Sequence, residues 1–423
     1  MPTSSSSRGA PGVNEAPGTW TRTTLGQLAC YLRNGVFASR PSDDDTGTPI
    51  LRISAVRDLA VDLRDIKFVQ GVPRDVQAKY FVEEGDLLFT RYNGSRRLVG
   101  ICARVPVHTR RIMHPDKLIR VVVDPDTVDS RFIAYQMASP AVRTFLEPRI
   151  RTTAGQSGVS GGDIKAIPVV VPSLSQQRRI VEILEDHLSR LDAAAAQVAT
   201  VQQRLETWRR LTLDRLVREL ASGTTKLSSL IERVEAGRSF GGSAAPAGLD
   251  EWGIIKVSAM TWGAFDAHEN KAVPADRVDP RFEIRPGDVL VSRANTTEYV
   301  GAPVLVVATR PRLLLSDKSL RLVPRPGIDR SWLATVLGVR STRRQVSRLA
   351  TGTKDSMRNI SQSSLLSVEV PLASEQQQRE VVDRAAAIQD RAKQLNAELS
   401  STLVRGQTLR RALLAAAFSG RLT

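Results

Sequence analysis

Residues 85–93 read Gly-Asp-Leu-Leu-Phe-Thr-Arg-Tyr-Asn, and residues 287–295 read Gly-Asp-Val-Leu-Val-Ser-Arg-Ala-Asn. Each stretch joins a Gly-Asp turn, a short run of strand-forming residues and an Arg-x-Asn segment, which is typical of a buried strand followed by a polar loop. The two stretches begin 202 residues apart. A repeat of this period predicts a duplicated domain, because solenoid repeats are only about 20 to 50 residues long.

The duplication extends well beyond this strand and loop. Asp116-Lys117 matches Asp317-Lys318, and Phe132-Ile133-Ala134 matches Trp332-Leu333-Ala334. Each copy opens with short strand-like runs between Gly, Pro and Asp turns, continues with helical stretches such as 130–146 and 330–349, and ends in a long helical segment. We therefore predict an α+β fold in two copies, each followed by a long helix.

The two long helices carry apolar residues at alternating spacings of four and three. This spacing is typical of a coiled-coil seam, and the first helix, which lacks Pro and Gly, would be roughly 69 Å long. We predict that the helices pair as an antiparallel coiled coil; the alternative is that each packs separately on its own domain. The predicted seams are Ile180, Leu184, Leu191, Ala194, Val198, Val201, Leu205 and Trp208 in the first helix, and Val381, Ala385, Ile388, Ala392, Leu395, Leu399 and Leu409 in the second.

These patterns predict five segments along the chain. They are a disordered leader at 1–19, a first recognition domain at 20–173, a first coiled-coil helix at 174–221, a second recognition domain at 222–373 and a second coiled-coil helix at 374–423.

The charge is concentrated in the two globular segments. The 423 residues carry a net charge of +16, of which segments 20–173 and 222–373 hold +6 each, while the helices hold +1 and +3. Two basic domains indicate a polyanionic partner, with nucleic acid the first candidate. Two cysteines argue against a disulfide framework, and no apolar run is long enough for a membrane span, so we expect a cytoplasmic protein with no membrane partner.

Enzyme motifs are weak or missing. The sequence contains no Pro-Pro of a DNA N-methyltransferase motif and no Gly-Lys-Ser/Thr of a nucleotide-binding loop. Residues 158–162 formally fit the Gly-x-Ser-x-Gly of a hydrolase, but the second copy lacks these glycines. Asp116 with Asp163 and Lys165 superficially fits a metal-dependent nuclease, yet Ser364 and Leu366 stand in place of the latter two in the second copy. We predict no catalytic residue, no metal site and no cofactor.

The ordered, twice-repeated set of motifs resembles the DNA-specificity (S) subunit of type I restriction–modification systems. The resemblance rests on Leu-Gly-Gln-Leu at 25–28, the Gly-Asp strand with its Arg-x-Asn loop, the helix entry at 171–181 and the C-terminal stretch at 413–423, and it covers nearly everything after residue 20. It implies two target-recognition domains that each read half of a bipartite, asymmetric site in double-stranded DNA. It also implies helices that set the half-site spacing and dock two DNA-methyltransferase subunits.

The same resemblance implies that S-adenosylmethionine is bound by the methyltransferase partner, that endonuclease and translocase subunits join for phage defence, and that this chain is not itself catalytic. Two alternatives remain open. One is a DNA-binding adaptor of another defence system, and the other is a stand-alone DNA-modifying enzyme.

Candidate DNA contacts are chosen by residue chemistry. Arginine pairs with guanine through two hydrogen bonds and asparagine pairs with adenine, and arginine or lysine also binds phosphate. Each cation could equally belong to a solvated face. The candidates are Arg91, Tyr92, Asn93, Arg96, Arg97, Arg149 and Arg151 in the first domain, and Arg293, Asn295, Thr296, Arg343, Arg344 and Lys354 in the second.

Overall fold

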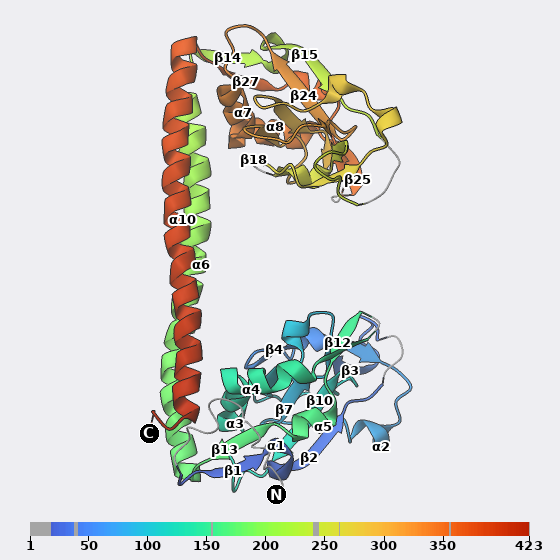
Figure 1. Ribbon diagram of the computed structural model, residues 1–423, viewed down its shortest axis with the longest axis vertical. Coiled ribbons are helices and arrows are strands. Elements are labelled where there is room, and N and C mark those ends of the chain that lie inside the picture. Colours follow the sequence, from blue (N-terminus) through green and yellow to red (C-terminus); the bar gives the residue numbers. More distant parts are fainter. Residues whose placement is uncertain are drawn as a thin grey trace, which may run out of the picture. The chain divides into compact units, whose positions relative to one another are not determined.

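The computed structural model describes residues 18–37, 41–153, 155–239, 245–261, 263–354 and 357–422. Most of the predicted leader, residues 1–17, lies outside this part. The chain divides into two compact units. Unit 1 consists of Met1–Val198 with Ser401–Thr423, and unit 2 is Ala199–Ser400. Each unit combines sheets with helices, which confirms the predicted α+β class (Figure 1).

Unit 1 is built around a four-stranded antiparallel sheet in the order β2-β10-β7-β9, and smaller sheets surround it. The strand predicted from the opening motif is β7, and it is buried along its whole length. The strands of unit 1 are β1 (Thr21–Thr24), β2 (Ala29–Asn34), β3 (Thr48–Leu51), β4 (Val56–Arg57), β5 (Ala60–Val61), β6 (Ile66–Val69), β7 (Leu87–Thr90), β8 (Tyr92–Asn93), β9 (Cys102–Arg104), β10 (Leu118–Val123), β11 (Arg151–Thr153), β12 (Gln156–Gly158) and β13 (Pro168–Val171). Its shorter helices are α1 (Leu25–Leu28), α2 (Arg74–Gln77), α3 (Ser130–Met137), α4 (Pro140–Leu146) and α5 (Gly161–Lys165).

Unit 2 repeats this plan with the sheet β15-β24-β20-β22, in which β20 corresponds to β7. Its strands are β14 (Gly223–Lys226), β15 (Ile231–Ala236), β16 (Gly253–Ile255), β17 (Met260–Thr261), β18 (Ala264–Phe265), β19 (Asn270–Ala272), β20 (Val289–Ser292), β21 (Ala294–Asn295), β22 (Pro303–Leu305), β23 (Leu313–Leu314), β24 (Ser319–Pro324), β25 (Thr351–Lys354), β26 (Met357–Asn359) and β27 (Glu369–Leu372). Its shorter helices are α7 (Arg330–Gly338), α8 (Arg340–Leu349) and α9 (Gln362–Leu366).

A buried ion pair explains two of the repeated residues. Arg120 on β10 lies 2.6 Å from Asp86, at the start of β7, and Arg321 on β24 lies 3.0 Å from Asp288, at the start of β20. Removing one partner would leave an unpaired buried charge, which is far more costly than losing a surface pair. The Gly-Asp motif therefore anchors the central sheet in each copy.

The stretches expected as single helices, 130–146 and 330–349, are each divided in two. In the first copy Pro140 stands at the first position of α4, because proline has no N–H to continue α3. In the second copy Val339 is extended between α7 and α8, and the backbone N–H of Ser341 is capped by Asp214.

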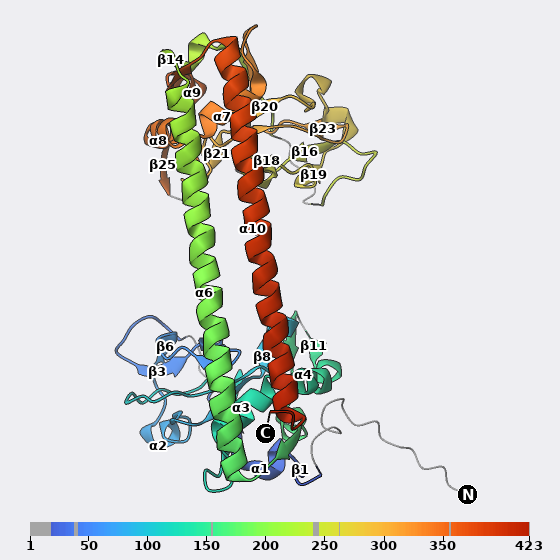
Figure 2. The ribbon, with the colours of Figure 1, turned by 90° about the vertical axis from the view of Figure 1, so that its left-hand side faces the viewer.

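The long helices are α6 (Leu174–Glu219) and α10 (Glu375–Phe418), and they lie side by side in each unit (Figure 2). In unit 1, Leu184 and Leu188 of α6 share a core with Leu414 and Phe418 of α10. In unit 2, residues 213–217 of α6 pack with the first turns of α10, including Val381 and Ala385. The start of one helix meets the end of the other in both cases, which confirms the antiparallel pairing.

Two residues of the predicted seam of α6, Val201 and Trp208, do not lie on it, whereas Val198 and Leu205 are half-buried. Val201 and Trp208 are each 44% exposed, while their neighbours Gln202 and Arg209 are half-buried. Gln202 donates to Asn396 of α10 at 3.0 Å. The run of alanines before residue 198 supports more than one phase of the repeat, so apolar spacing alone assigned the wrong residues. Leu409 of α10 is likewise 51% exposed.

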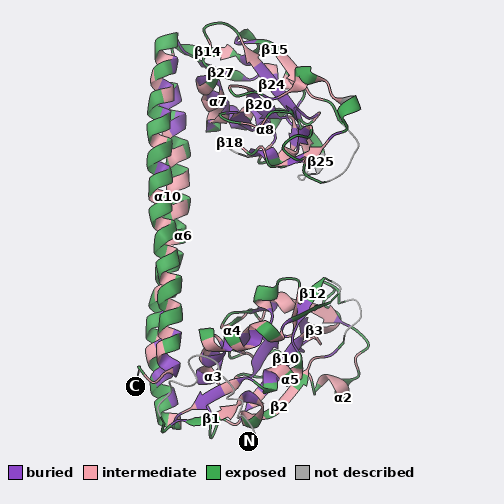
Figure 3. Cartoon of the chain, viewed as in Figure 1, coloured by how far each residue is buried: buried purple, intermediate pink, exposed green. Residues whose placement is uncertain are grey.

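Burial concentrates in the sheet-bearing part of each unit and at the helix ends that contact it (Figure 3). In the described part of the chain, no helix is apolar over a span sufficient to cross a lipid bilayer.

Candidate nucleic-acid interface

In each unit a small three-stranded sheet carries the Arg-x-Asn segment. In unit 1 the order is β11-β12-β8, and in unit 2 it is β21-β26-β25. We call these the β8 sheet and the β21 sheet. In each sheet the central strand, β12 or β26, pairs with the segment containing Tyr92 or Ala294, and the strand before it, β11 or β25, pairs with its other edge. Sequence candidates some 60 residues apart, such as Asn93 and Arg151, are therefore brought into one sheet.

The first residue of the segment is held by the repeated Asp-Lys turn. The backbone N–H of Arg91 donates to the Lys117 carbonyl at 2.8 Å, and that of Arg293 donates to the Lys318 carbonyl at 2.8 Å. The Arg91 guanidinium lies 4.7 Å from the centre of the Tyr92 ring, and its Nη1 donates to the Asp116 carbonyl at 3.4 Å. The Asp-Lys motif is thus a backbone support for both loops.

The asparagines shape the turn that follows. The side-chain oxygen of Asn93 accepts from the Ser95 N–H at 2.9 Å, and that of Asn295 accepts from the Thr296 N–H at 2.8 Å. Asn295 also donates to the Ser292 hydroxyl at 3.3 Å. Asparagine side chains commonly bond the backbone of such turns. The residues shared by the two loops therefore fix the backbone, whatever else they contact.

Tyr92 in unit 1 and Ala294 in unit 2 differ in size, and so do their strand partners. Tyr92 pairs with Gly158, where an added Cβ would lie 2.2 Å from the tyrosine ring. Ala294 takes the place of the tyrosine in unit 2, and its strand partner is Asn359. The same backbone position therefore carries a large, half-buried aromatic side chain in one sheet and a small, buried one in the other.

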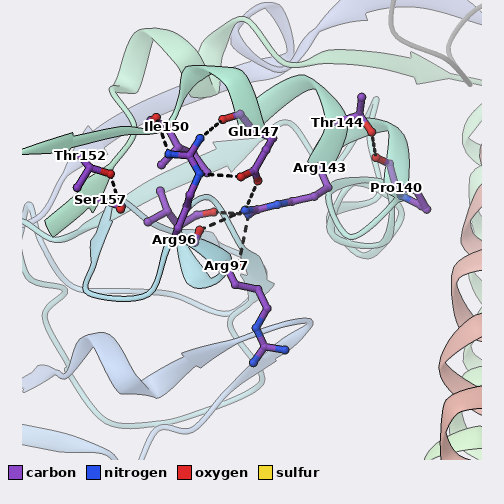
Figure 4. Close-up of polar contacts among 10 residues, drawn as sticks. Arg96, Arg97, Pro140, Arg143, Thr144, Glu147, Ile150, Thr152 and Ser157 are labelled. Carbon is purple, nitrogen blue, oxygen red and sulfur yellow. Dashed lines mark hydrogen bonds and ion pairs between the residues drawn. The ribbon is translucent and has the colours of Figure 1, made fainter. Parts of the chain in front are cut away.

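Arg96 belongs to an internal clamp. Its guanidinium donates to the Glu147 carboxylate at 2.7 Å and to the carbonyls of Glu147 and Ile150 at 2.6 and 3.1 Å. Arg143 of α4 donates to the Val99 carbonyl at 2.9 Å and pairs with the same carboxylate. These contacts hold the pKa of Glu147 below its usual range. In Figure 4 the Arg97 side chain extends away from the clamp, and Arg97 is exposed.

Arg343 of α8 in unit 2 corresponds to Arg143 of α4 in unit 1. It is 8% exposed and donates to the carbonyls of Val300 and Gly301, directly after the Arg-x-Asn loop. Burial lowers its pKa to about 10. A side chain so enclosed holds the loop and is not presented to a ligand. Sequence reasoning selected Arg343 and missed Arg143, although the 200-residue offset between the two was a usable signal.

The remaining candidates differ in exposure. Arg149 stacks 3.7 Å from the centre of the Phe145 ring and donates to that residue's carbonyl. Thr296 is exposed. Arg151 and Arg344 are exposed, and within the described residues neither side chain has a hydrogen-bond or ion-pair partner. The side chain of Lys354, on β25, lies outside what the structure describes.

The motifs weighed as enzymatic have local structural roles. Ser160 caps α5: its hydroxyl accepts from the Asp163 N–H at 3.1 Å, and the Asp163 carboxylate accepts from the Ser160 N–H at 2.8 Å. This reciprocal pairing is a capping box. In the described ranges, no three His, Cys, Asp or Glu side chains gather as a metal site would require.

Known proteins share this arrangement. No protein-family model matches the chain. The EcoKI type I restriction enzyme specificity subunit of Escherichia coli (strain K12) is 34% identical over 224 residues, which cover 50% of this chain and 48% of the relative. The StySPI specificity subunit of Salmonella potsdam is 26% identical over 241 residues, covering 53% and 50%. The chain spans about half the length of these curated relatives.

A solved structure that concerns complex assembly and conformational transition of the type I R-M system contains a chain of the same fold. It matches with a TM-score of 0.69 at 19% identity, over 96% of this chain and 99% of that chain. In sequence, this chain is similar to type I restriction enzyme specificity subunits over about half of its length. In this chain the three-stranded sheet and the Arg-x-Asn loop occur twice, and Arg143 and Arg343 both donate to backbone carbonyls that follow the loop.

Proposed function

We propose that this chain is the specificity subunit of a type I restriction–modification system, that it reads a bipartite, asymmetric site in double-stranded DNA with one half-site for each unit, and that it is not itself catalytic. The observation that carries the proposal is the pair of matching three-stranded sheets. Their backbones are held by the same contacts, while Tyr92 and Arg151 in the β8 sheet are replaced by Ala294 and Thr351 in the β21 sheet. Two sheets with the same backbone support but different side chains are suited to bind two different DNA sequences.

The exposed cations would supply affinity without sequence preference. Arg97, Arg151 and Arg344 are free of internal partners among the described residues, so their donors can reach phosphate. Arg96 and Arg343 have most of their donors on the protein and would act by holding the loops.

We further propose that α6 and α10 dock two DNA-methyltransferase subunits and set the spacing of the half-sites. In unit 2, Val201, Trp208 and Leu211 of α6 are between 44 and 46% exposed, and in unit 1, Val404 and Leu409 of α10 are 61 and 51% exposed. Large apolar side chains on the outside of paired helices suit a protein interface, and tryptophan is a frequent anchor in such interfaces. S-adenosylmethionine would be bound by the methyltransferase, and the assembled complex would recruit endonuclease and translocase subunits.

Trp208 offers a direct test of docking. Trp208→Ala should weaken capture of the methyltransferase subunit at least tenfold and leave thermal unfolding of the isolated chain within about 2 °C, because the side chain is half exposed. Leu216→Ala, on the buried seam of the same helix, is the control and should lower stability. Unchanged capture by the Trp208 variant would contradict docking at this surface.

The main experiment is methylome sequencing of a host that expresses this chain with a type I methyltransferase subunit. We expect adenine methylation at one bipartite sequence only when both proteins are present. Exchange of residues 92–98 should change one half of that sequence and leave the other half intact. Methylation or cleavage by the purified chain alone, or failure to form a complex with any methyltransferase, would overturn the proposal.

A further inference from the structure

Helix α8 of unit 2 carries three arginines along one exposed face. Arg340, Arg344 and Arg348 are spaced four residues apart and all are exposed, while Arg343 and Val346 face the core. Successive members of this set, which we call the α8 ridge, are separated by about 6 Å along the helix axis.

The ridge has no internal counter-charge. Within the described residues, none of the three side chains has a hydrogen bond, an ion pair or an aromatic ring as partner. On the long helices some exposed arginines are paired, as Arg215 is with Glu219 and Arg384 is with Glu380, and single ones such as Arg204 have no partner among the described residues. Like charges four residues apart destabilise a helix, so an unpaired row of three suits an external anion.

The duplication shows that the ridge is peculiar to unit 2. The matching positions in unit 1 are Pro140, Thr144 and Pro148, and the Thr144 hydroxyl donates to the Pro140 carbonyl within its own helix. The loop after the Arg-x-Asn segment differs in the opposite sense, because there the cation is in unit 1. Arg97 lies two residues before Val99-Gly100, and Glu298 lies two residues before the matching Val300-Gly301. The domains carry equal net charge, yet the cations lie on the loop in one and on the helix in the other.

We infer that the α8 ridge binds the phosphate backbone of duplex DNA beside the half-site read by unit 2. The inference rests on the proposed function. The ridge spans about 12 Å, and over that length of duplex one strand presents three to four phosphates. Helix α8 ends at Leu349, and β25 of the β21 sheet begins at Thr351, so the ridge leads directly to the candidate base-reading sheet.

As a consequence, the two units contribute differently to the affinity for DNA. Unit 2 makes a larger sequence-independent contribution to binding, which depends more steeply on salt. Unit 1, with Pro and Thr in place of the ridge, depends more on its loop residues Arg97 and Arg151.

The test uses the complete complex with its methyltransferase subunit and a duplex that carries the target sequence. The dissociation constant is measured from about 50 to 200 mM salt for the wild type and for R340Q/R344Q/R348Q. Each lost phosphate contact reduces the slope of log K against log salt by about 0.9, so we expect a slope shallower by two to three units. The methylated sequence should not change.

Two controls separate local contact from general charge. K226Q/R285Q/R325Q removes the same charge from exposed positions elsewhere in unit 2 and should leave the slope within about half a unit. Thr144→Arg places a ridge cation on α4 of unit 1 and should steepen the slope by about 0.9. The single variant R344Q should lower the slope by about 0.9 and guards against loss of folding in the triple variant.

The outcomes distinguish the two proposals. An unchanged slope with intact sequence-specific methylation overturns the ridge and leaves the proposed function standing. Loss of methyltransferase binding with an unchanged slope would show that the ridge contacts protein, which also overturns it. A wild-type complex with no preference for any duplex would instead overturn the proposed function.

Discussion

The arginine side chains near the Arg-x-Asn loops fall into two groups, according to what their guanidinium donors contact. Arg96, Arg143 and Arg343 bond carbonyls of their own unit. Arg97 and Arg151 are exposed and make no such bond among the described residues. The first group should therefore affect stability and the second should affect DNA affinity.

Arg96 and Arg97 are adjacent and test this distinction directly. Arg97→Ala should reduce the salt slope of DNA binding by about 0.9 and leave the unfolding midpoint unchanged. Arg96→Ala should lower the stability of unit 1 by about 1–2 kcal/mol, because it removes the guanidinium bonds to the carbonyls of Glu147 and Ile150 and one of the two arginine partners of the Glu147 carboxylate. The measurements are DNA titration at several salt concentrations and urea unfolding. Equal effects of the two variants on both quantities would refute the division.

His114 predicts a pH dependence of unit 1. The side chain is fully buried, its Nδ1 lies 2.7 Å from the Tyr80 carbonyl, and burial, with Arg120 nearby, lowers its pKa from 6.5 to about 4. Between these values the unfolded chain binds a proton that the folded chain does not. Stability should therefore fall as pH falls from 6.5 towards 4, by up to about 1.4 kcal/mol for each pH unit.

Pulse proteolysis in urea at several pH values would measure this dependence. The control is His114→Asn, which keeps a polar group near the Tyr80 carbonyl and does not titrate. The unit 1 midpoint of this variant should change less with pH than that of the wild type. Parallel curves would show that other groups set the pH dependence.

At the scale of elements, one glutamine ties each long helix to its unit. Gln177 of α6 accepts from the Asp129 N–H at 2.9 Å and donates to the carbonyls of Thr127 and Pro172. Gln378 of α10 makes the same contacts with Asp329, Gly327 and Ala373. Gln177 and Gln378 are buried, and each thus connects the start of a long helix to the loop that precedes α3 or α7.

Gln177→Leu should destabilise unit 1 by about 2–3 kcal/mol, because it leaves three backbone groups without partners in a buried site. Gln176→Ala is the matched control. Its side chain is on the surface and caps only Ser173, so the cost should be below about 1 kcal/mol. Thermal unfolding followed by circular dichroism would compare the two variants, and a similar loss of stability in both would contradict this role of Gln177.

Much of the element pattern follows from the sequence, and its details depend on packing. The repeat predicted the α+β copies, and the start expected for the first helix agrees with α6 at Leu174. Val201 and Trp208 were misassigned to the seam, because the polar residue Gln202 takes a place at the interface, where it donates to Asn396. The site was predicted as a set of residue types. Which arginines are enclosed depends on carbonyls such as that of Gly301, whose positions no local pattern reveals.

At the scale of the whole molecule, unit 1 is assembled from both ends of the chain. Leu414, Ala417 and Phe418 of α10 are buried in the core that contains Phe132 of α3, and the Phe132 and Phe418 rings meet edge to face at 5.3 Å. In unit 2 the equivalent surface is covered by Leu213, Leu216 and Val217 of α6. Each long helix thus closes the core of the unit that lies at its far end.

Phe418→Ala should therefore destabilise unit 1 by about 3 kcal/mol or more, although the residue lies nearly 300 positions from the sheet it covers. Hydrogen exchange in β7 and β10 should accelerate, while β20 and β24 of unit 2 remain protected. Leu409→Ala, at an exposed position of the same helix, is the control and should have little effect. Equal acceleration in the two units would contradict separate cores.

This closure by the last helix has a consequence for biosynthesis. Unit 2 is a continuous segment, Ala199–Ser400, whereas unit 1 also needs Ser401–Thr423. Domains usually fold from the N-terminus as the ribosome releases them. Residues 1–198 of unit 1 are translated before unit 2 but can complete their core only once α10 has been made, and until then the apolar surface that α10 covers stays open to chaperones or to the same helix of a neighbouring nascent chain.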